Sequence, residues 1–404
     1  MTHLPAKPSP ESVAGQVRQS DRHPHERLTT WLSGITLAIS WLWVVQPAWR
    51  QTSFSMHPWA VGDWVINLQG GPVRRSILGE LLFSTGVSAD QAAQVVIGLQ
   101  VVLLAGVYFT SFRLFLGTSR SPAWAMLLLS PAFTLFPLLS FDGGLRKELL
   151  TLVSISLLGL LLTKRRGAIW IVFPLAIYVV AAAGHETASL TLPAFLYLLW
   201  FGYSRGILGR RAFGAWAIAF TSVAAAALAW AVAYPGTATQ VQGICRSWLA
   251  RGASPEACTG SISALDDGIL DVIRQVSLQF PEYFSYLPLA VLAAAPLALL
   301  RVPKSVWILL GLTYACLVPV FLTGIDYGRW IYLATGITSI VTMTVWASPT
   351  REEVRVPLVV AVLYVTLWSL PYTGPVTQAP LFTRIVEGPY HLFAAWLGRA
   401  TGVS

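Results

Sequence analysis

Two arginines directly follow a pair of glycines in the segment Gly70-Gly71-Pro72-Val73-Arg74-Arg75. Glycine lets the backbone approach a ligand closely, and two guanidinium groups can grip an anion with forked hydrogen bonds. A short apolar segment, 76–83, follows, and the N-terminus of a helix there would add to an anion site. The alternative is an interfacial arginine pair that binds lipid headgroups.

A second charged run, Phe141-Asp142-Gly143-Gly144-Leu145-Arg146-Lys147-Glu148, comes directly before a long apolar segment. Near the start of a helix, Arg146 and Lys147 each oppose the helix dipole by about 0.3–1 kcal/mol. A compensating group is therefore expected, either a bound phosphate or the flanking acids. In the second case Asp142 caps the helix and Glu148 joins a local salt-bridge cluster.

Two further carboxylates stand beside basic groups. Glu186 follows His185, so it could act as a general base tuned by that histidine, or be a favourable acid in the first turn of a helix. Asp326 comes shortly before Arg329 and could pair with it in a polar cavity or cap the next helix. The sequence has no second histidine at metal-ligand spacing, so it predicts no zinc site.

The elements that must position these residues are apolar. The chain has 404 residues, of which 55% are hydrophobic and 11% charged, whereas an ordinary soluble domain is about 25% charged. Lipid must therefore be the solvent for much of its surface. The expected fold is all-α, a polytopic integral membrane helical bundle. Its transmembrane helices, about eleven, are expected near 30–48, 92–115, 122–140, 147–163, 168–184, 187–203, 212–234, 284–300, 305–323, 329–347 and 356–370.

The lysines and arginines of short loops predict the orientation. With the N-terminus inside and the C-terminus outside, every inner loop holds at least two cations, and the carboxylates gather in the outer loops. Segment 76–83 is too short to cross and is expected to be interfacial or re-entrant. The regions expected are a polar cytoplasmic tail (1–27), a transmembrane domain (28–370) and an outer tail (371–404).

The longest outer loop, 235–283, contains Cys245 and Cys258. In an oxidising compartment a disulfide between them is expected, and two unpaired cysteines are the alternative. Cys316 lies in an apolar run and is expected to serve packing.

Several classes of protein are disfavoured. The sequence has no long basic stretch and no basic patch interleaved with aromatic residues, so no nucleic-acid partner is expected. It also lacks a Walker A motif, a Gly-rich dinucleotide loop, a Gly-x-Ser-x-Gly motif and an HExxH motif. A cytoplasmic nucleotide-sugar donor is thereby disfavoured, and the arginine clusters favour an anionic substrate already in the membrane.

With these residues the chain resembles two groups of bacterial inner-membrane enzymes that handle polyprenyl-linked sugars. Polytopic glycosyltransferases of the GT-C type keep an acidic residue in the first outer loop, which Asp63 matches. Polysaccharide polymerases of the Wzy type carry an Arg-x-x-x-Gly pattern in outer loops, which Arg75-Ser-Ile-Leu-Gly79 matches. The same pattern recurs at Arg205–Gly209 on the predicted inner side.

The resemblance implies glycosyl transfer from a polyprenyl-phosphate-linked sugar on the periplasmic face of the inner membrane, in cell-envelope polysaccharide synthesis. The enzyme would add a single sugar or polymerise repeat units, and its partners would include membrane lipid, the polyprenyl-linked saccharide and other envelope-polysaccharide assembly proteins. No metal is obligatory, because phosphate is a good leaving group, but a divalent cation stays open. The candidate bases are Asp63, Glu186 and Asp326; the candidate phosphate ligands are Arg74, Arg75, Arg146, Lys147 and Arg329; the supporting candidates are Gly70, Gly71, Asp142, Glu148 and His185.

Two other classes fit the same charges. A transporter or flippase would use them to move a lipid-linked or anionic solute, and a non-catalytic envelope scaffold would tolerate neutralising the outer carboxylates. A composite enzyme site requires Arg75, Arg146, Glu186 and Asp326 to line one cavity.

Overall fold

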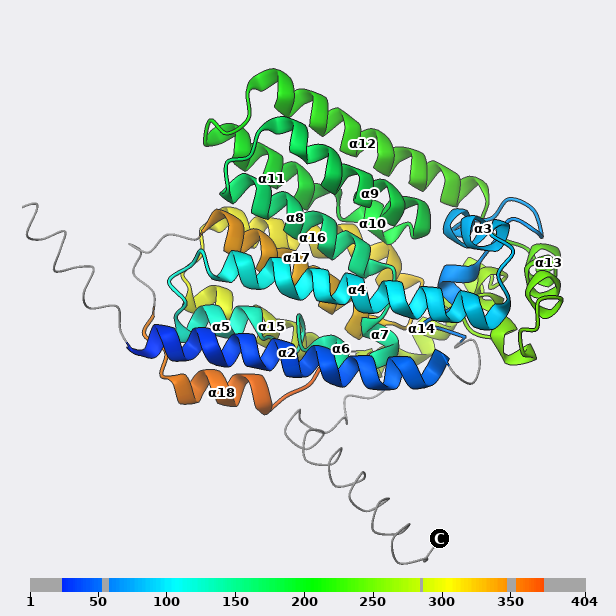
Figure 1. The fold of residues 1–404 in the computed structure, drawn as a ribbon, viewed down its shortest axis with the longest axis horizontal. Helices are drawn as coiled ribbons and strands as arrows, with labels where there is room; N and C mark the ends of the chain where they lie inside the picture. The colour runs from blue at the N-terminus through cyan, green and yellow to red at the C-terminus, as the bar shows by residue number, and fades with distance from the viewer. Residues whose placement is uncertain (1–23, 53–57, 284–285, 347–353, 374–404) are drawn as a thin grey trace, which may run out of the picture.

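The computed structural model describes residues 24–52, 58–283, 286–346 and 354–373. Within these ranges every regular element is a helix, which confirms the all-α class (Figure 1). The α-helices are α2 (Pro24–Thr52), α3 (Ser76–Ser84), α4 (Ala89–Phe115), α5 (Pro122–Leu128), α6 (Phe136–Leu139), α7 (Phe141–Gly144), α8 (Glu148–Thr163), α9 (Val172–Gly184), α10 (Thr187–Leu190), α11 (Leu192–Ser204), α12 (Arg210–Ala233), α13 (Ala238–Leu249), α14 (Ile269–Tyr283), α15 (Tyr286–Leu299), α16 (Lys304–Leu322), α17 (Tyr327–Val345) and α18 (Leu358–Thr366). The 3-10 helices are η1 (Gly62–Val65), η2 (Ala168–Ile171), η3 (Pro255–Cys258) and η4 (Ser263–Leu265).

The long helices lie side by side along the long axis of the molecule (Figure 1). At the centre, α8 contacts α4, α9, α11 and α17. Helix α17 is buried on all sides from Gly328 to Thr344. Two of its buried hydroxyls are satisfied within the helix, since Thr338 donates to the carbonyl of Ala334 at 2.8 Å and Thr342 to that of Thr338 at 2.7 Å. The core can therefore hold polar side chains without unpaired hydroxyls at these positions.

Four helices among the described residues, α2, α4, α12 and α16, are long and apolar enough to cross a membrane. Large apolar side chains point outward from them, such as Trp31 on α2 and Val232 on α12, which is 81% exposed. Such surfaces are unfavourable in water and favourable in lipid. A helix, or a pair of successive helices, also lies in each of the other predicted segments. The eleven crossings and the orientation of the ends stay predictions.

The predicted span 122–140 is not one helix, because it is interrupted between α5 and α6. Pro131 lacks an N–H and disfavours helical geometry at the preceding residue. Side chains satisfy the freed backbone: Thr134 Oγ1 donates to the carbonyl of Leu128 at 2.6 Å, and Ser130 Oγ accepts a nearby backbone N–H at 3.2 Å. Non-helical backbone within a membrane bundle requires this kind of internal satisfaction.

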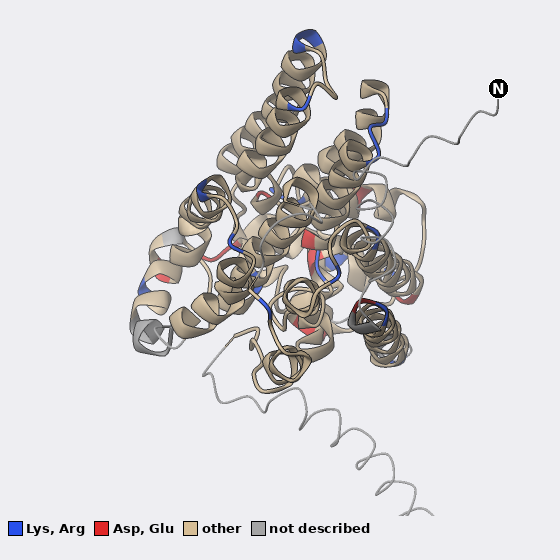
Figure 2. Cartoon of the chain, turned by 90° about the vertical axis from the view of Figure 1, so that its left-hand side faces the viewer, with Lys and Arg blue, Asp and Glu red and all other residues tan. Residues whose placement is uncertain are grey.

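The two ends of the bundle differ. Helices α3 and α13 lie at one end, on the right in Figure 1. Figure 2 looks onto the opposite end, where Lys and Arg stand at several helix ends and loops. Arg120, Arg165 and Arg301 adopt left-handed backbone angles in the turns after α4, α8 and α15 (φ 56°, 49° and 47°). Cations at helix C-termini are favourable because they face the negative end of the dipole.

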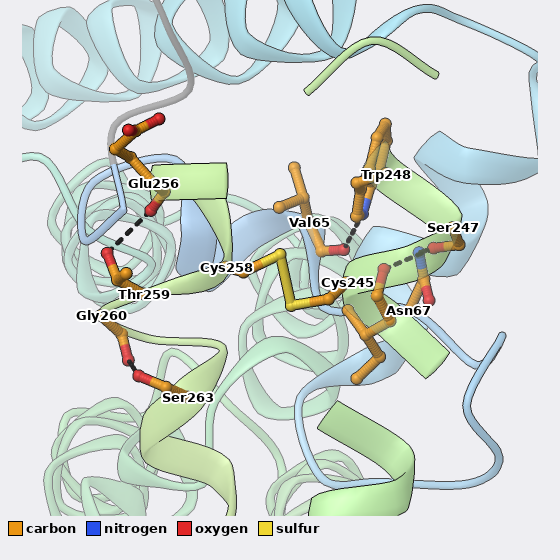
Figure 3. The surroundings of a disulfide bond; sticks show 11 residues. Val65, Asn67, Cys245, Ser247, Trp248, Glu256, Cys258, Thr259, Gly260 and Ser263 are labelled. Atoms are coloured by element: carbon orange, nitrogen blue, oxygen red, sulfur yellow. Dashed lines mark hydrogen bonds between the residues drawn. A yellow bond between two sulfur atoms is a disulfide. The ribbon is translucent and has the colours of Figure 1, made fainter. Parts of the chain in front are cut away.

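Helix α13 closes the α3 end of the bundle by packing on η1 and the chain after it (Figure 3). The Trp248 indole donates to the carbonyl of Val65 at 2.8 Å, and the Asn67 amide donates to Ser247 Oγ at 2.9 Å. A disulfide joins Cys245 to Cys258, with their Cα atoms 5.4 Å apart, and so ties α13 to η3. The pair expected from the sequence is thus bonded.

Removing this disulfide should loosen the α13 cap. Cross-linking a loop of this size stabilises a fold by up to about 3 kcal/mol, by restricting the unfolded chain. We expect the double variant Cys245→Ser/Cys258→Ser to unfold at lower denaturant than the wild type, and Cys316→Ser to match the wild type. Equal stability of the double variant, with all three thiols of the wild type labelled by maleimide before reduction, would contradict the assignment.

Candidate functional site

Five charged residues from separate segments meet at the α3 end and are called the charge cluster. They come from η1, from the residues before α3 and α8, and from the link between α9 and α10. Its members are Asp63, Arg74, Arg75, Lys147 and Glu186. The structure therefore brings together candidates that the sequence separates by more than 120 positions.

Arg75 and Glu186 form a hydrogen-bonded ion pair at the partly exposed edge of the charge cluster. Arg75 Nε donates to Glu186 Oε2 at 2.9 Å, and Arg75 Nη2 donates to Oε1, so the pair is bidentate. Arg74 Nη1 lies 3.6 Å from the same Oε1. The side chains of Arg74, Arg75 and Glu186 are 28%, 20% and 15% exposed. This partly exposed side is called the open edge of the charge cluster.

Asp63 and Lys147 form the closed side of the charge cluster. Asp63 Oδ1 lies 3.8 Å from Lys147 Nζ and 3.7 Å from Arg75 Nη1, and neither carboxylate oxygen accepts a hydrogen bond within the described residues. Lys147 is fully buried, and its Nζ donates to the carbonyl of Gly184 at 2.9 Å. That carbonyl belongs to the last turn of α9, where a cation is favourable. Lys147 thus serves the helix end and Asp63 rather than an incoming phosphate.

Glu186 stays ionised in the folded protein. Burial alone would raise the pKa of Glu186, but the charge and hydrogen bonds of Arg75, together with Arg74, hold it well below its usual value. Burial also opposes ionisation of Asp63, whose pKa is nevertheless lowered by Lys147 and Arg75. Both groups are therefore carboxylates at neutral pH.

A pH dependence follows from the lowered pKa of Glu186. Its folded pKa lies below that of the unfolded chain, about 4.3, so the Arg75 pair stabilises the fold above that pH and loses its effect as the pH falls through the folded pKa. We expect the difference in thermal midpoint between wild type and Glu186→Gln to stay constant from about pH 8 to pH 5. A difference that vanishes between pH 7 and 5 would contradict the lowered pKa.

His185 lies beside Glu186 and is itself neutral. Burial lowers the pKa of His185 well below its usual value. The Thr187 N–H donates to His185 Nδ1 at 3.2 Å, and Thr187 Oγ1 lies 2.9 Å from the same nitrogen. Nδ1 is thus an acceptor and has no proton for Glu186, whose Oε2 is 3.6 Å away. Thr187 occupies the nitrogen that faces the carboxylate, which disfavours proton transfer from His185 to Glu186, and the expected tuning of Glu186 by His185 stays a prediction.

Arg329 forms a second group beside the charge cluster. Its Nη2 lies 3.0 Å from Asp326 Oδ2, and its Nε lies 3.5 Å from Glu148 Oε1. Asp326 stands at the start of α17 but makes no side-chain cap there. The Arg329 guanidinium also lies over the Trp330 ring, 4.2 Å from its centroid. Arg329 is thus held between two carboxylates and buried, so its assignment as a phosphate ligand is disfavoured.

Arg146 is buried and uses its guanidinium group to join several segments of the chain, so it does not form an open anion site. Its Nε donates to the carbonyl of Asp142 at 2.6 Å, its Nη2 donates to the Tyr372 hydroxyl at 2.7 Å, and its Nη1 donates to the carbonyl of Trp59 and lies 3.4 Å from Ser261 Oγ. The residue is 1% exposed. Arg146 therefore cannot share an open cavity with the rest, and the composite site must be smaller than expected.

The substitution Arg146→Lys tests whether Arg146 has a structural role or binds phosphate. Lysine cannot reproduce the planar fork of Arg146, so Arg146→Lys should leave buried acceptors unpaired, each costing about 1–3 kcal/mol. We expect a lower free energy of unfolding with unchanged affinity for phosphate-bearing lipids, measured by denaturant titration and by binding to the folded fraction. Loss of lipid binding at unchanged stability would restore Arg146 as a ligand.

The two glycines serve packing rather than an anion. A Cβ on Gly70 would lie 2.2 Å from the carbonyl oxygen of Gln240, so only glycine lets this segment touch α13. Gly71 has φ +108°, a conformation that other residues rarely adopt. Glu80 then fixes the loop by accepting the Leu68 N–H at 2.8 Å. The close backbone approach expected of the glycines exists, but its partner is the chain itself.

Several residues around these groups were not among the sequence candidates. Tyr372 and Trp59 enclose Arg146, and the Trp330 ring lies between Arg329 and His185, 6.4 Å from the latter. The sequence offered little reason to select these aromatic residues, because aromatic residues are common near membrane interfaces. Within the described residues no group of three or more His, Cys, Asp or Glu could hold a metal ion.

No family model matches this chain, and neither a curated protein nor a solved structure is significantly similar to it.

Proposed function

We propose that this protein is a membrane glycosyltransferase that takes a sugar from a polyprenyl-phosphate-linked donor at the α3 end of the bundle. The observation that carries the proposal is the open edge of the charge cluster. There the adjacent guanidinium groups of Arg74 and Arg75 are partly exposed and lie within reach of one carboxylate, Glu186. Guanidinium pairs suit phosphate oxygens, and a nearby carboxylate suits proton removal from a hydroxyl.

The surroundings of the arginines favour a lipid-borne donor. Helix α3, which begins directly after Arg75, exposes Leu81 by 63% and Ile77 by 38%. The Arg74 N–H donates to the carbonyl of Tyr234 at 2.8 Å, just beyond the exposed end of α12. Apolar faces thus flank the arginines on two sides, as a site for a phosphate on a hydrocarbon chain requires.

The geometry supports a direct displacement. The acceptor hydroxyl oxygen attacks the anomeric carbon, a new C–O bond forms, and the C–O bond to the lipid phosphate breaks with its electron pair on the phosphate. Arg74 and Arg75 stabilise the negative charge of the leaving phosphate. Glu186, the exposed carboxylate, accepts the hydroxyl proton, and the buried Asp63 positions Arg75 and Lys147. Asp326 forms an ion pair with Arg329, so it is a weaker candidate for the general base than Glu186.

The proposal includes a membrane frame. Eleven crossings with the N-terminus in the cytoplasm place the α3 end outside, and the resemblance to lipid-linked-sugar enzymes then puts it on the periplasmic face of a bacterial inner membrane. Support comes from the outward apolar side chains and from the basic residues at the opposite end of the bundle (Figure 2). Its partners are a polyprenyl-linked saccharide and other envelope-polysaccharide assembly proteins.

Loss of the gene and its complementation test the function. In the source organism, the deletion strain is complemented with wild type, Arg75→Ala, Glu186→Ala or the exposed-surface control Arg246→Ala at matched membrane levels. We expect only wild type and the control to restore surface glycan, measured on gels and by mass spectrometry. Shorter chains would indicate a polymerase, and one missing sugar a single-addition transferase. Glycan that is unchanged in the deletion strain, under conditions in which the parent strain expresses the gene, would reject glycosyl transfer.

Transport of a lipid-linked anion is the second candidate, and the interrupted span between α5 and α6 favours it, since transporters often use broken helices. The interruption is closed, however, because Ser130 and Thr134 already satisfy backbone groups there. The lipid-linked intermediates of the deletion strain separate the two. A flippase defect leaves a complete precursor on the inner face, a single-addition defect leaves a precursor that lacks one sugar, and a polymerase defect leaves unpolymerised repeat units on the outer face.

A further inference from the structure

We propose that Arg74, Arg75 and Glu186 form an exchange site, in which the Glu186 carboxylate holds the place of a lipid phosphate until that phosphate displaces it. This inference rests on the proposed function for its ligand class, a phosphate ester on a hydrocarbon chain. It adds that binding of the donor itself releases the base.

At the exchange site, the carboxylate of Glu186 does not provide acceptors for all the N–H donors of the two arginines. Glu186 offers two oxygens, and both are used by Nε and Nη2 of Arg75. Arg74 reaches the same carboxylate only at 3.6 Å, and its buried Nε has no hydrogen-bond partner among the described residues. A lipid diphosphate presents more non-bridging oxygens than a carboxylate, so a diphosphate-linked donor can serve both guanidinium groups at once.

Charge favours the same exchange. Arg74 and Arg75 face one shared carboxylate, and burial together with the positive charge of Arg75 lowers the pKa of Arg74. Asp267, an exposed residue, also acts on Arg74 but is screened by water. Within the charge cluster the cations Arg74, Arg75 and Lys147 outnumber the carboxylates Asp63 and Glu186. A diphosphate-linked lipid donor, which carries two negative charges, would therefore balance the cations better than Glu186 does.

The backbone at Arg75 is held in an uncommon state. Its φ of 65° lies in the left-handed region, which non-glycine residues seldom adopt. Such conformations persist where the surroundings impose them. The conformation places Arg75 at the start of α3, between Asp63 on the buried side and Glu186 on the open side.

Exchange would couple binding to catalysis. Once phosphate oxygens occupy the arginines, Glu186 loses the cations that keep it a poor base, and its affinity for a proton rises. The carboxylate is then released beside the donor's anomeric carbon, where a hydroxyl must be deprotonated. An empty site keeps its base locked, which protects the enzyme from reacting without a donor.

Binding to purified protein in nanodiscs tests the exchange. The probes are farnesyl phosphate, farnesol and inorganic phosphate, applied to wild type, Glu186→Gln, Arg75→Ala and the control Arg246→Ala. We expect Glu186→Gln, which removes the competing charge, to bind farnesyl phosphate at least about threefold more tightly than wild type. We expect Arg75→Ala to lose about tenfold or more and Arg246→Ala to lose none.

The probes separate the sources of phosphate. Tight binding of farnesyl phosphate with weak binding of farnesol and inorganic phosphate supports a lipid phosphate, and equal binding of inorganic phosphate overturns it. Weaker or unchanged binding by a folded Glu186→Gln also overturns the exchange. If Glu186→Gln binds more tightly but wild type transfers no sugar, the exchange site stands and the proposed function fails.

A measurement on wild type avoids the risk that a variant misfolds. A water-soluble carbodiimide with glycine ethyl ester modifies accessible carboxyl groups, and peptide mass mapping locates the modification. Farnesyl phosphate should increase modification of Glu186 severalfold, whereas farnesol should not. No increase at saturating farnesyl phosphate would show that Glu186 stays on Arg75, and the exchange would be rejected.

Discussion

Arg75→Ala should lower the rate of sugar transfer by about 100-fold or more, because removing one group that stabilises developing charge in the transition state costs about 10²–10³ in rate. The loss should fall on the chemical step as well as on donor binding, since Arg75 both contacts the phosphate and frees Glu186. The measurement is transfer of sugar from a polyprenyl-phosphate donor by the purified enzyme in nanodiscs, at donor concentrations that saturate the wild type.

Arg75→Lys and Arg246→Ala are the matched controls for this effect. Lysine keeps the charge of Arg75 but not its fork, so part of the activity should return. Arg246 lies exposed on α13 at the same end, and its side-chain contact is with Gln242 at 3.5 Å. Its removal should leave transfer unchanged. Equal activity of Arg75→Ala and wild type at saturating donor would remove Arg75 from the site.

The sequence could predict which charged residues share one membrane face, because membrane solvation constrains them strongly. Cations in short loops favour one side, and carboxylates within apolar segments must find partners. Asp63, Arg75 and Glu186 come from distant segments, yet each stands next to a helix end on the same predicted face. Topology alone therefore predicts that they share one face, and only the structure shows that Arg75 contacts both carboxylates.

The sequence could not predict what each cation binds. Arg146 and Lys147 are adjacent and chemically similar to the Arg74/Arg75 pair, and both pairs precede a helix. Only the fold shows that Lys147 reaches the α9 carbonyl of Gly184 and that Arg146 bonds to Tyr372, 226 positions away. These acceptors offset the unfavourable position of the two cations at the start of α8. A bound phosphate was one of the groups expected to do so. Long-range acceptors of this kind leave no periodic signal in the sequence.

The interruption of the span 122–140 and the close contact at Gly70 were equally hard to predict from the sequence. The segment 122–140 is apolar enough to predict a continuous span, and Pro131 alone does not fix where the helix stops, because prolines occur within membrane helices. The hydroxyls of Ser130 and Thr134 decide the outcome by bonding to the freed backbone. Gly70 is similar, since its partner Gln240 becomes visible only when α13 is in place.

Arg329→Met should destabilise the fold more than any other change at this end. The Glu148 side chain is 1% exposed, and its oxygens accept no hydrogen bond within the described residues, so Arg329 is the cation that offsets its charge. Leaving a buried charge unpaired costs about 3–5 kcal/mol. The measurement is the free energy of unfolding in mixed micelles of detergent and SDS.

The double variant Glu148→Gln/Arg329→Met decides whether charge pairing is the cause. Methionine and glutamine keep the volume, and the double variant buries no unpaired charge at these two positions. It should therefore be more stable than Arg329→Met alone, whereas independent effects would add. If Arg329 instead bound the donor phosphate, Arg329→Met would lose affinity for farnesyl phosphate at nearly unchanged stability, and Glu148→Gln would rescue nothing. Rescue with intact lipid binding would confine the phosphate to Arg74 and Arg75.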